Sequence, residues 1–285
     1  VKIEYLLLNG AECEPYITSD YRELMENSDN VLAGIDLIMR KLEIPKAIIG
    51  IEEDKLNAID KLTKLCVRYP NIKVQKLPGA YPQGAEKVLV HSLTGRVVEE
   101  GKLPSDVGCM VMNVSTAGFI YGYIKTGVPL IRRRITIDGN IVNNPANFFI
   151  PVGTLLHSIV GFADVRKQPD RIVLGGPMMG SCAFDPDTPL GKTNNAVLLF
   201  GDTAAVQPTA CIRCGRCVRA CAANLMPTEL EQAFDARDVK ELQRLKVNLC
   251  MNCGACSFVC PAKRNLAEKN QLAKDFLRAA TAPKK

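Results

Sequence analysis

The chain has twelve cysteines, and eight of them lie in two runs near its C-terminus. Each run reads Cys-x2-Cys-x2-Cys-x3-Cys, and Pro261 follows the second run. At this spacing the first three thiolates of a run bind one [4Fe–4S] cluster, and the fourth binds the other cluster. The spacing therefore predicts two clusters and a role in electron transfer. The first cluster is expected to use Cys211, Cys214, Cys217 and Cys260, and the second Cys250, Cys253, Cys256 and Cys221.

Zinc is the alternative ligand for these cysteines. Two Cys-x2-Cys motifs can make one four-cysteine zinc site, but two complete runs hold twice that number of thiolates. A Cys-Pro ending is typical of ferredoxins, although Ala222 follows the first run where proline is usual. We therefore expect about four iron and four sulfide ions per cluster. A predicted helix over Thr228–Leu245 separates the runs, so the domain resembles helical dicluster ferredoxins.

The basic charge of the chain belongs to the same region. Residues 208–285 hold 14 Lys and Arg against 7 Asp and Glu, whereas residues 1–207 hold 22 against 23. A basic domain can bind nucleic acid. We favour another explanation, because cysteine-ligated clusters are anionic and nearby cations offset their charge. Such a surface also attracts an acidic, ferredoxin-like partner.

The cysteine pattern also bears on location. Cysteines in cluster runs rather than disulfide pairs favour a reducing cytoplasm. No signal peptide or membrane helix is predicted, since the longest uncharged run, Val107–Ile124, contains polar residues and three glycines and suits a buried strand and turn. The chain begins at Val1, almost inside a strand-like run, so we expect further sequence upstream.

The first 127 residues alternate between strand and helix patterns. The predicted strands are Ile3–Leu8, Lys46–Gly50, Lys73–Leu77 and Cys109–Val114, and the predicted helices are Asp29–Leu42, Lys55–Tyr69, Glu86–Thr94 and Thr116–Lys125. Such alternation predicts an α/β fold, here a Rossmann-like α/β sandwich with mainly parallel strands. We assign this domain to residues 1–127.

The pattern changes after Thr126. Arg132–Asp138 alternates between polar and apolar residues and ends at the hairpin signal Asp138-Gly139-Asn140. A short helix over Thr154–Val160 and a strand over Arg171–Leu174 follow. We expect a small β-rich domain over residues 128–206, then an α-helical ferredoxin domain over residues 207–285 that ends with a helix at Leu266–Ala280.

Three polar loops follow predicted strands of the first domain. They are Asn9–Pro15 (NGAECEP), Gly79–Lys87 (GAYPQGAEK) and Asn113–Thr116 (NVST). Ligands of α/β sheets gather outside the carboxyl ends of the strands, so the loops are expected to converge on one crevice. They offer glycine for close backbone approach, and Asn and Thr for hydrogen bonds. Glu12 and Glu14 would bind ribose hydroxyls or be solvated loop acids.

These loops, together with IPVGT, GGPMMG and the two cysteine runs in that order, resemble the C subunit of the Rnf electron-transport complex. The chain is more distantly similar to the flavin-carrying, NADH-oxidising subunit of respiratory complex I. The resemblance covers essentially the whole chain, and the order of motifs is more specific than any one of them. It implies FMN in the crevice and NADH stacked against it. It also implies a β-grasp module of the soluble-ligand-binding type over residues 128–206, for which a structural spacer is the alternative role.

The resemblance also implies roles for individual residues. Asn9, Gly84, Asn113 and Thr116 match the flavin-binding positions of the three loops, and Glu12 matches an acid of the first loop. Glu14 and Glu86 would face the nucleotide. Three positions depart from the complex I pattern, since Ala11 replaces Asp, Ala85 replaces Glu and Met112 replaces Asn. The family's glycine-rich phosphate loop is expected upstream of Val1, and without it FMN binding would be weak or absent.

The leading functional prediction is an NADH dehydrogenase-type subunit, bound peripherally at the cytoplasmic face of the cell membrane. It would work with other Rnf-type subunits and ferredoxin-like proteins, and pass electrons reversibly between NADH and ferredoxin. One alternative is a soluble NADH-dependent carrier that feeds a proline or cobalamin reductase, and another is a flavin-free iron–sulfur relay. No catalytic triad is visible, and His91 and His157 are expected to be structural. The remaining cysteines (Cys13, Cys66, Cys109 and Cys182) are expected to be small buried hydrophobes, least firmly at Cys13.

Overall fold

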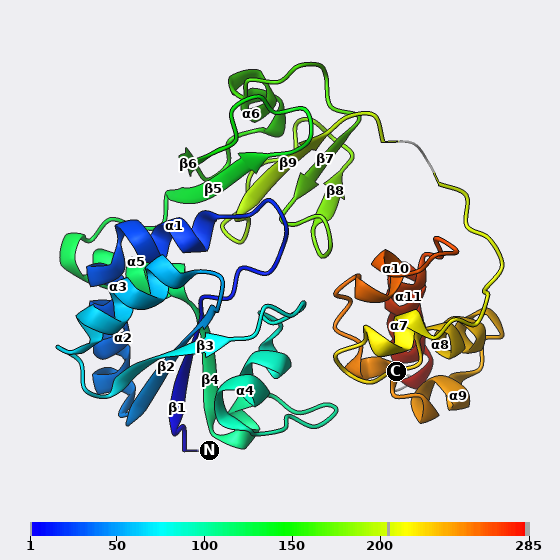
Figure 1. Cartoon of the computed structure of the whole chain (residues 1–285), viewed down its shortest axis with the longest axis horizontal. Coiled ribbons are helices and arrows are strands. Elements are labelled where there is room, and N and C mark those ends of the chain that lie inside the picture. Colours follow the sequence, from blue (N-terminus) through cyan, green and yellow to red (C-terminus); the bar gives the residue numbers. More distant parts are fainter. Residues whose placement is uncertain (1, 204–205, 283–285) are drawn as a thin grey trace. The chain divides into compact units, whose positions relative to one another are not determined.

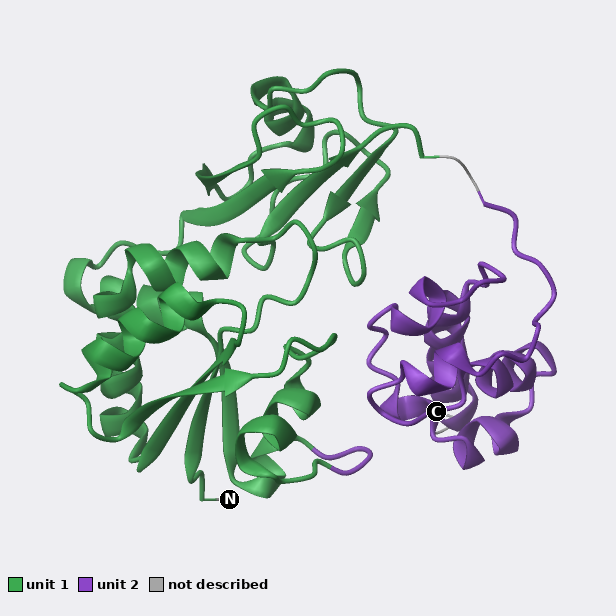
Figure 2. Ribbon diagram, in the orientation of Figure 1, with its two compact units in different colours: residues 1–98, 103–203 green, residues 99–102, 204–285 purple. Residues whose placement is uncertain are grey.

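The computed structural model describes residues 2–203 and 206–282 of the chain (Figure 1). It divides into two compact units, one of residues 1–98 and 103–203 and the other of residues 99–102 and 204–285 (Figure 2). The first unit contains two β-sheets, and the second contains no strand among its described residues. The boundary we predict at residue 127 falls between the two sheets of the first unit and stays a prediction.

The first sheet has four parallel strands in the order β3-β2-β1-β4. The strands are β1 (Tyr5–Asn9), β2 (Lys46–Glu52), β3 (Ile72–Leu77) and β4 (Cys109–Asn113). The helices are α1 (Ser19–Glu26), α2 (Ser28–Leu42), α3 (Leu56–Cys66), α4 (Glu86–Thr94) and α5 (Val114–Thr126), with a 3-10 turn η1 at Pro104–Val107. The predicted Rossmann-like sandwich is confirmed.

The alternation of side chains along β1 builds a core on each face of this sheet. Leu6 and Leu8 point to the face covered by α2, α3 and α5, whereas Leu7 points to the face covered by α4 (Figure 1). All three leucines are fully buried. Helices α2 and α5 approach closely at Gly34, where a Cβ would lie only 2.0 Å from the Ala117 carbonyl oxygen.

The second sheet has five strands in the order β6-β5-β9-β7-β8. These are β5 (Arg132–Asp138), β6 (Ala146–Pro151), β7 (Arg171–Leu174), β8 (Ser181–Ala183) and β9 (Ala196–Phe200), and α6 spans Leu156–Phe162. Strands β5 and β9 are parallel, and the other neighbours are antiparallel. This order agrees with the predicted β-grasp type of domain, although β6, β8 and β9 were not predicted individually.

The second unit is a bundle of short helices. They are α7 (Arg216–Arg219), α8 (Pro227–Asp235), α9 (Val239–Arg244), α10 (Ala255–Phe258) and α11 (Leu266–Thr281), with a 3-10 turn η2 at Val247–Leu249. The single helix predicted over Thr228–Leu245 is wrong. It breaks at Arg237, whose φ is 55°, and a new helix starts where the Asp238 carboxylate accepts the Glu241 N–H at 3.0 Å.

The structure also tests the expectations about membrane helices and about the cysteines outside the two runs. None of the helices within residues 2–203 and 206–282 is long and apolar enough to cross a membrane. The run Val107–Ile124 forms β4 and most of α5 instead. Cys109 is buried and Cys66 is half-buried, as expected of small hydrophobes, but Cys182 is exposed on the edge strand β8, so that expectation is wrong for Cys182.

Candidate functional site

Asn9 and Asn113 end two neighbouring strands of the first sheet. They are register partners in the last pair of the parallel β1–β4 ladder. The Asn9 side chain donates to the Gly84 carbonyl oxygen at 2.9 Å and accepts the Ala11 N–H at 3.2 Å. The three predicted flavin loops therefore meet at the carboxyl edge of the sheet, as expected for a ligand crevice.

Gly84 permits the close approach of the second loop to the first. A Cβ at this position would lie 3.0 Å from the Ala11 carbonyl oxygen and 3.6 Å from both terminal atoms of the Asn9 side chain. A larger residue would therefore push the loops apart. Asn9 keeps one amide hydrogen and one lone pair beyond these two hydrogen bonds, and these remain for a ligand.

Glu12 binds the N-terminus of α1. Its carboxylate accepts hydrogen bonds from the Asp20 N–H at 2.8 Å, the Tyr21 N–H at 2.9 Å and the Ser19 hydroxyl at 3.2 Å. Burial and the nearby Asp20 carboxylate raise the pKa of Glu12 to about 7. Glu12, which the sequence suggested as a ribose-binding or solvated acid, therefore holds the N-terminus of α1 instead.

Asp20 and Glu52 are functional-site neighbours that the sequence did not reveal. Asp20 is buried and accepts from the Asn113 amide and the Ser115 hydroxyl, both at 2.7 Å. Glu52, at the end of β2, accepts the Glu12 N–H at 3.1 Å, and burial raises its pKa. A signal for Glu52 existed, because it is an acid that ends a buried strand (KAIIGIE).

Glu14 links the first loop to the second sheet. Its carboxylate accepts the Met178 N–H at 3.0 Å and the Tyr81 hydroxyl at 3.4 Å. Burial is the largest effect on its carboxyl and raises its pKa. Met178 belongs to the GGPMMG loop, and a Cβ on Gly176 would lie 2.1 Å from the Glu14 carboxylate. This segment therefore packs directly against the Glu14 carboxylate.

The other two predicted residues lie in the first turns of helices. Thr116 is half-buried at the start of α5, where the Asn113 side chain caps the helix by accepting the Ser115 N–H at 2.8 Å. Glu86 is exposed at the start of α4. Neither side chain takes part in the hydrogen bonds that join Asn9, Gly84, Glu12 and Asp20.

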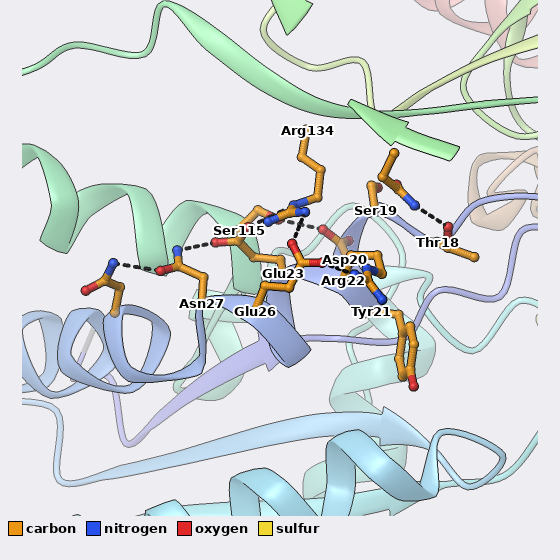
Figure 3. A network of polar contacts seen from close by, with 12 residues as sticks. Thr18, Ser19, Asp20, Tyr21, Arg22, Glu23, Glu26, Asn27, Ser115 and Arg134 are labelled. Atoms are coloured by element: carbon orange, nitrogen blue, oxygen red, sulfur yellow. Dashed lines mark hydrogen bonds and ion pairs between the residues drawn. The ribbon is translucent and has the colours of Figure 1, made fainter. Parts of the chain in front are cut away.

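A buried ion pair joins α1 to the second sheet (Figure 3). Arg134 of β5 pairs with Glu23 at 3.3 Å and also with Glu26, and both Arg134 and Glu23 are about nine-tenths buried. Arg134, Glu23 and Glu26 also line a cavity of about 590 Å³, together with residues of α5 and β5. Since Arg134 is neutralised by its own glutamates, the network is a structural junction and not an anion site.

The eight run cysteines line two cavities of the second unit. One cavity, of about 410 Å³, is lined by Cys211, Cys214, Cys217 and Cys260. The other, of about 20 Å³, is lined by Cys221, Cys250, Cys253 and Cys256. Each cavity thus collects three cysteines of one run and the last cysteine of the other. We call these the first and second cysteine sets.

Both sets fit an inorganic cluster better than a zinc ion. A zinc ion draws its four sulfurs to about 2.3 Å from a single point. Among the described residues, no three His, Cys, Asp or Glu side chains are close enough to hold one ion. Asn270 also lines the cavity of the second set, is 1% exposed, and its Oδ1 has no hydrogen-bond partner. A polar atom buried without a partner indicates that something else occupies the space beside it.

Two family models match the chain. Residues 1–122 match the Nuo51 FMN-binding domain, and residues 210–264 match the 4Fe-4S dicluster domain. The C subunit of the proton-translocating ferredoxin:NAD(+) oxidoreductase complex of Clostridium ljungdahlii is 42% identical over 232 residues, which are 80% of this chain and 50% of that protein. The chain is similar to Rnf C subunits over about four-fifths of its length. The prediction from the motifs is therefore confirmed, as are the FMN-type and dicluster domains.

Other relatives extend this comparison. The C subunit of the Na(+)-translocating ferredoxin:NAD(+) oxidoreductase complex of Acetobacterium woodii is 37% identical over 237 residues, or 81% of this chain and 53% of that protein. The chain thus spans about half the length of these Rnf relatives. In a crystal structure of an NAD+-reducing [NiFe]-hydrogenase, one chain has the same fold, with a TM-score of 0.64 and 18% identity over 98% of this chain and 56% of that one.

Proposed function

We propose that this chain carries electrons between NADH and an ion-translocating membrane complex linked to ferredoxin. One observation carries the proposal: the eight cysteines gather into two sets with crossed membership, on the same chain as an FMN-binding-type sheet. Bound FMN would take a hydride from NADH and release its electrons singly to the clusters. The chain is accordingly an NADH dehydrogenase-type subunit.

The crevice at Asn9, Gly84 and Asn113 is the proposed flavin site. Asn9 and Asn113 each have hydrogen-bonding capacity left after holding their loops together. Thr116 lies in the first turn of α5, and anionic groups are favoured near a helix N-terminus. Glu12 acts indirectly by holding α1 and Asp20 in place, and Glu14 and Glu86 are the proposed acids on the nucleotide side.

The two cysteine sets are the proposed ligands of two [4Fe–4S] clusters. The protein contributes the thiolates, a water-poor cavity for the second set, and main-chain N–H groups that point to sulfur. Arg213 N–H donates to the Cys211 sulfur and Leu225 N–H to the Cys221 sulfur, both at 3.4 Å. Hydrogen bonds to sulfur and solvent exposure are among the factors that set cluster potentials.

The proposed partners are the other components of an Rnf-type complex and ferredoxin-like proteins. The two relatives named above belong to proton- and Na(+)-translocating complexes. We propose that this chain is peripheral to the membrane, and we place it on the cytoplasmic face, where NADH and reducing conditions for free thiols are found.

The test uses the full-length natural protein, purified without oxygen and supplied with FMN, iron and sulfide. We expect about eight iron and eight sulfide ions per chain, a flavin absorbance that NADH bleaches, and an EPR signal from both clusters after NADH is added. Reduction of a viologen dye by NADH measures the complete relay. A protein with intact clusters that NADH cannot reduce would instead be a flavin-free relay.

The soluble-carrier alternative is tested in cells. A tagged copy at natural expression level is expected to co-purify with integral membrane proteins of the complex and to remain on washed membranes. Salt washing at increasing concentration measures how strongly it is held. If the protein is always recovered in the soluble fraction, together with a soluble reductase, the membrane-complex assignment is wrong.

A further inference from the structure

The basic side chains of the second unit fall into two groups. Several are paired with carboxylates, for example Arg244 with Glu241 at 2.6 Å and Arg264 with Glu231 at 2.8 Å. Others are exposed and have no carboxylate partner among residues 206–282. These include four residues in or beside the cysteine runs: Arg213, Arg216, Arg219 and Lys263.

This unpaired group arises from the distribution of acids along the chain. No Asp or Glu occurs in residues 208–228 or 242–267, the segments that contain the two cysteine runs. The first run carries three arginines between its cysteines, whereas the second run carries no charged residue at all. Of the two runs, only the first therefore carries positive charge.

Three of these cations lie around an exposed aromatic side chain. A shallow concavity of about 530 Å³ is lined by Arg216, Arg219 and Lys263 together with Phe258. Phe258 is 75% exposed, so its ring is available for contact with another molecule. An apolar centre with a charged rim is the usual composition of a protein–protein interface. We call this concavity the Phe258 surface.

The Phe258 surface borders the first cysteine set. Arg216, Cys260 and Pro261 line both this concavity and the cavity of that set. Cys211 and Cys214 of the set are themselves exposed. The cavity of the second set has no charged residue in its lining. A cluster in the first set would therefore be the one that lies directly beneath a surface open to another molecule.

We propose that the Phe258 surface docks the acidic face of an electron-transfer protein, and that electrons cross between the two proteins at the first cysteine set. This inference rests on the proposed cluster function. One electron passes from the reduced cluster to the oxidised centre of the acidic partner, or back, and no bond or proton changes place. The cations steer the encounter, and Phe258 supplies the contact that holds it.

The experiment measures electron transfer in stopped flow, from full-length protein reduced by dithionite to an oxidised acidic bacterial ferredoxin. The variant Arg216→Gln/Arg219→Gln is expected to slow the transfer about tenfold at low salt and to lose most of its salt dependence. Phe258→Ser is expected to slow it at high salt as well. Iron content and EPR spectra of each variant show that its clusters are intact.

A matched control removes the same amount of charge elsewhere in the unit. Arg244→Gln/Arg278→Gln deletes two exposed arginines that are paired with Glu241 and Asp275. It is expected to change the rate by less than about twofold, since a paired surface charge contributes little to steering. A basic acceptor, cytochrome c, is expected to react no slower with Arg216→Gln/Arg219→Gln than with the unchanged protein.

Three results would overturn the proposal. The first is equal slowing by the control pair, and the second is equal slowing with the basic acceptor. The third is a loss of binding to phosphatidylserine vesicles with unchanged transfer to the ferredoxin, which would make this a lipid-facing surface. Because dithionite reduces the clusters directly, the test is independent of whether NADH can do so.

Discussion

The Glu12 carboxylate accepts the Asp20 main-chain N–H at 2.8 Å, so two acids share the buried start of α1. Asp20 uses its own carboxylate to bind the Asn113 amide at 2.7 Å. The contact therefore connects the first of the three predicted flavin loops to the third, through the N-terminus of α1. Burial together with the Asp20 charge raises the pKa of Glu12 to about 7, which makes this junction sensitive to pH.

We predict that the first unit loses stability as the pH rises from about 4.5 to 7. Over this range Glu12 is ionised in the unfolded chain but protonated in the folded one. The free energy of unfolding is therefore highest below pH 4.5, and this contribution of Glu12 to stability is lost above pH 7. The loss is up to ~3 kcal/mol, because one pKa unit corresponds to about 1.4 kcal/mol. Urea unfolding followed by tyrosine fluorescence measures it, since all seven tyrosines lie within residues 5–123.

The variant Glu12→Gln isolates this carboxyl. An amide does not ionise, so the pH slope is expected to become shallower. Its single oxygen can replace only one of the two carboxylate oxygens that accept the α1 N–H groups, so the variant is also expected to be less stable at every pH. Some slope remains, because burial also raises the pKa values of Glu14 and Glu52. Glu43→Gln, at an exposed position, is expected to leave the slope as it is. An identical slope in the two variants would show that Glu12 titrates normally.

A second prediction concerns the bond between Glu14 and the GGPMMG loop. Glu14→Ala removes the acceptor of the Met178 N–H and is expected to destabilise the loop by ~1.5–3 kcal/mol. Gly176→Ala is expected to act similarly, because its Cβ would take the place of the Glu14 carboxylate. Hydrogen exchange read by mass spectrometry should show faster exchange over residues 175–180 in both variants.

The control for this pair is Glu53→Ala. Glu53 accepts the Gly79 N–H at 3.2 Å in an exposed loop, away from the bond between Glu14 and Met178. Its removal is expected to leave exchange over residues 175–180 unchanged. Slow exchange there in Glu14→Ala would mean that the loop is held by contacts other than this carboxylate.

Much of the first sheet was predictable from short runs between amphipathic helices, because each run is too short for a helix and the central strands β1 and β2 are mostly buried. Helix α1 was not predictable in this way. Its sequence SDYRELME has few apolar residues, and its start is held by Glu12, a residue outside it. The role of Glu12 could not be inferred for the same reason, since a capping partner is recognised only once the helix is known.

The cysteine sets illustrate the opposite case. The grouping of the cysteines around the two cavities agrees with the grouping that thiolate spacing predicts, and the assignment of ligands to clusters stays a prediction. The break in the helix at Arg237 could not be predicted, since the sequence of Thr228–Leu245 keeps a helical pattern through that residue. The contact between Glu14 and Met178 joins residues 164 positions apart, and no local pattern encodes a contact at that separation.

A third prediction tests the crossed membership of the sets. Cys221→Ala should remove the same cluster as Cys256→Ala, although Cys221 lies in the other run. Both variants are expected to keep about four iron ions per chain and the same remaining EPR signal. Cys260→Ala and Cys214→Ala should keep the other signal. If Cys221→Ala resembles Cys214→Ala instead, each run holds its own cluster.

The control here is Cys66→Ala, outside both runs. Burial raises the pKa of the Cys66 thiol to about 11, so it stays protonated and is a poor metal ligand. Both signals and the full iron content are expected in this variant. Loss of iron in Cys66→Ala would reveal a fault in cluster assembly that has nothing to do with ligation.

The last prediction concerns Asn270, whose amide is buried in α11 against the second cysteine set without a partner for Oδ1. In the chain without clusters, Asn270→Leu is expected to raise stability by ~1–3 kcal/mol, because an unsatisfied polar atom is removed. With clusters bound, the amide can turn and donate N–H to a cluster sulfur. Such a bond stabilises the more negative reduced cluster, so the same variant should lower the reduction potential of one cluster only.

Circular dichroism of the iron-free chain measures the change in stability, and EPR-monitored titration measures the change in potential. Gln271→Leu, on the exposed face of α11, is the control. A shift of both clusters, or of neither, would contradict a direct contact between Asn270 and the second set.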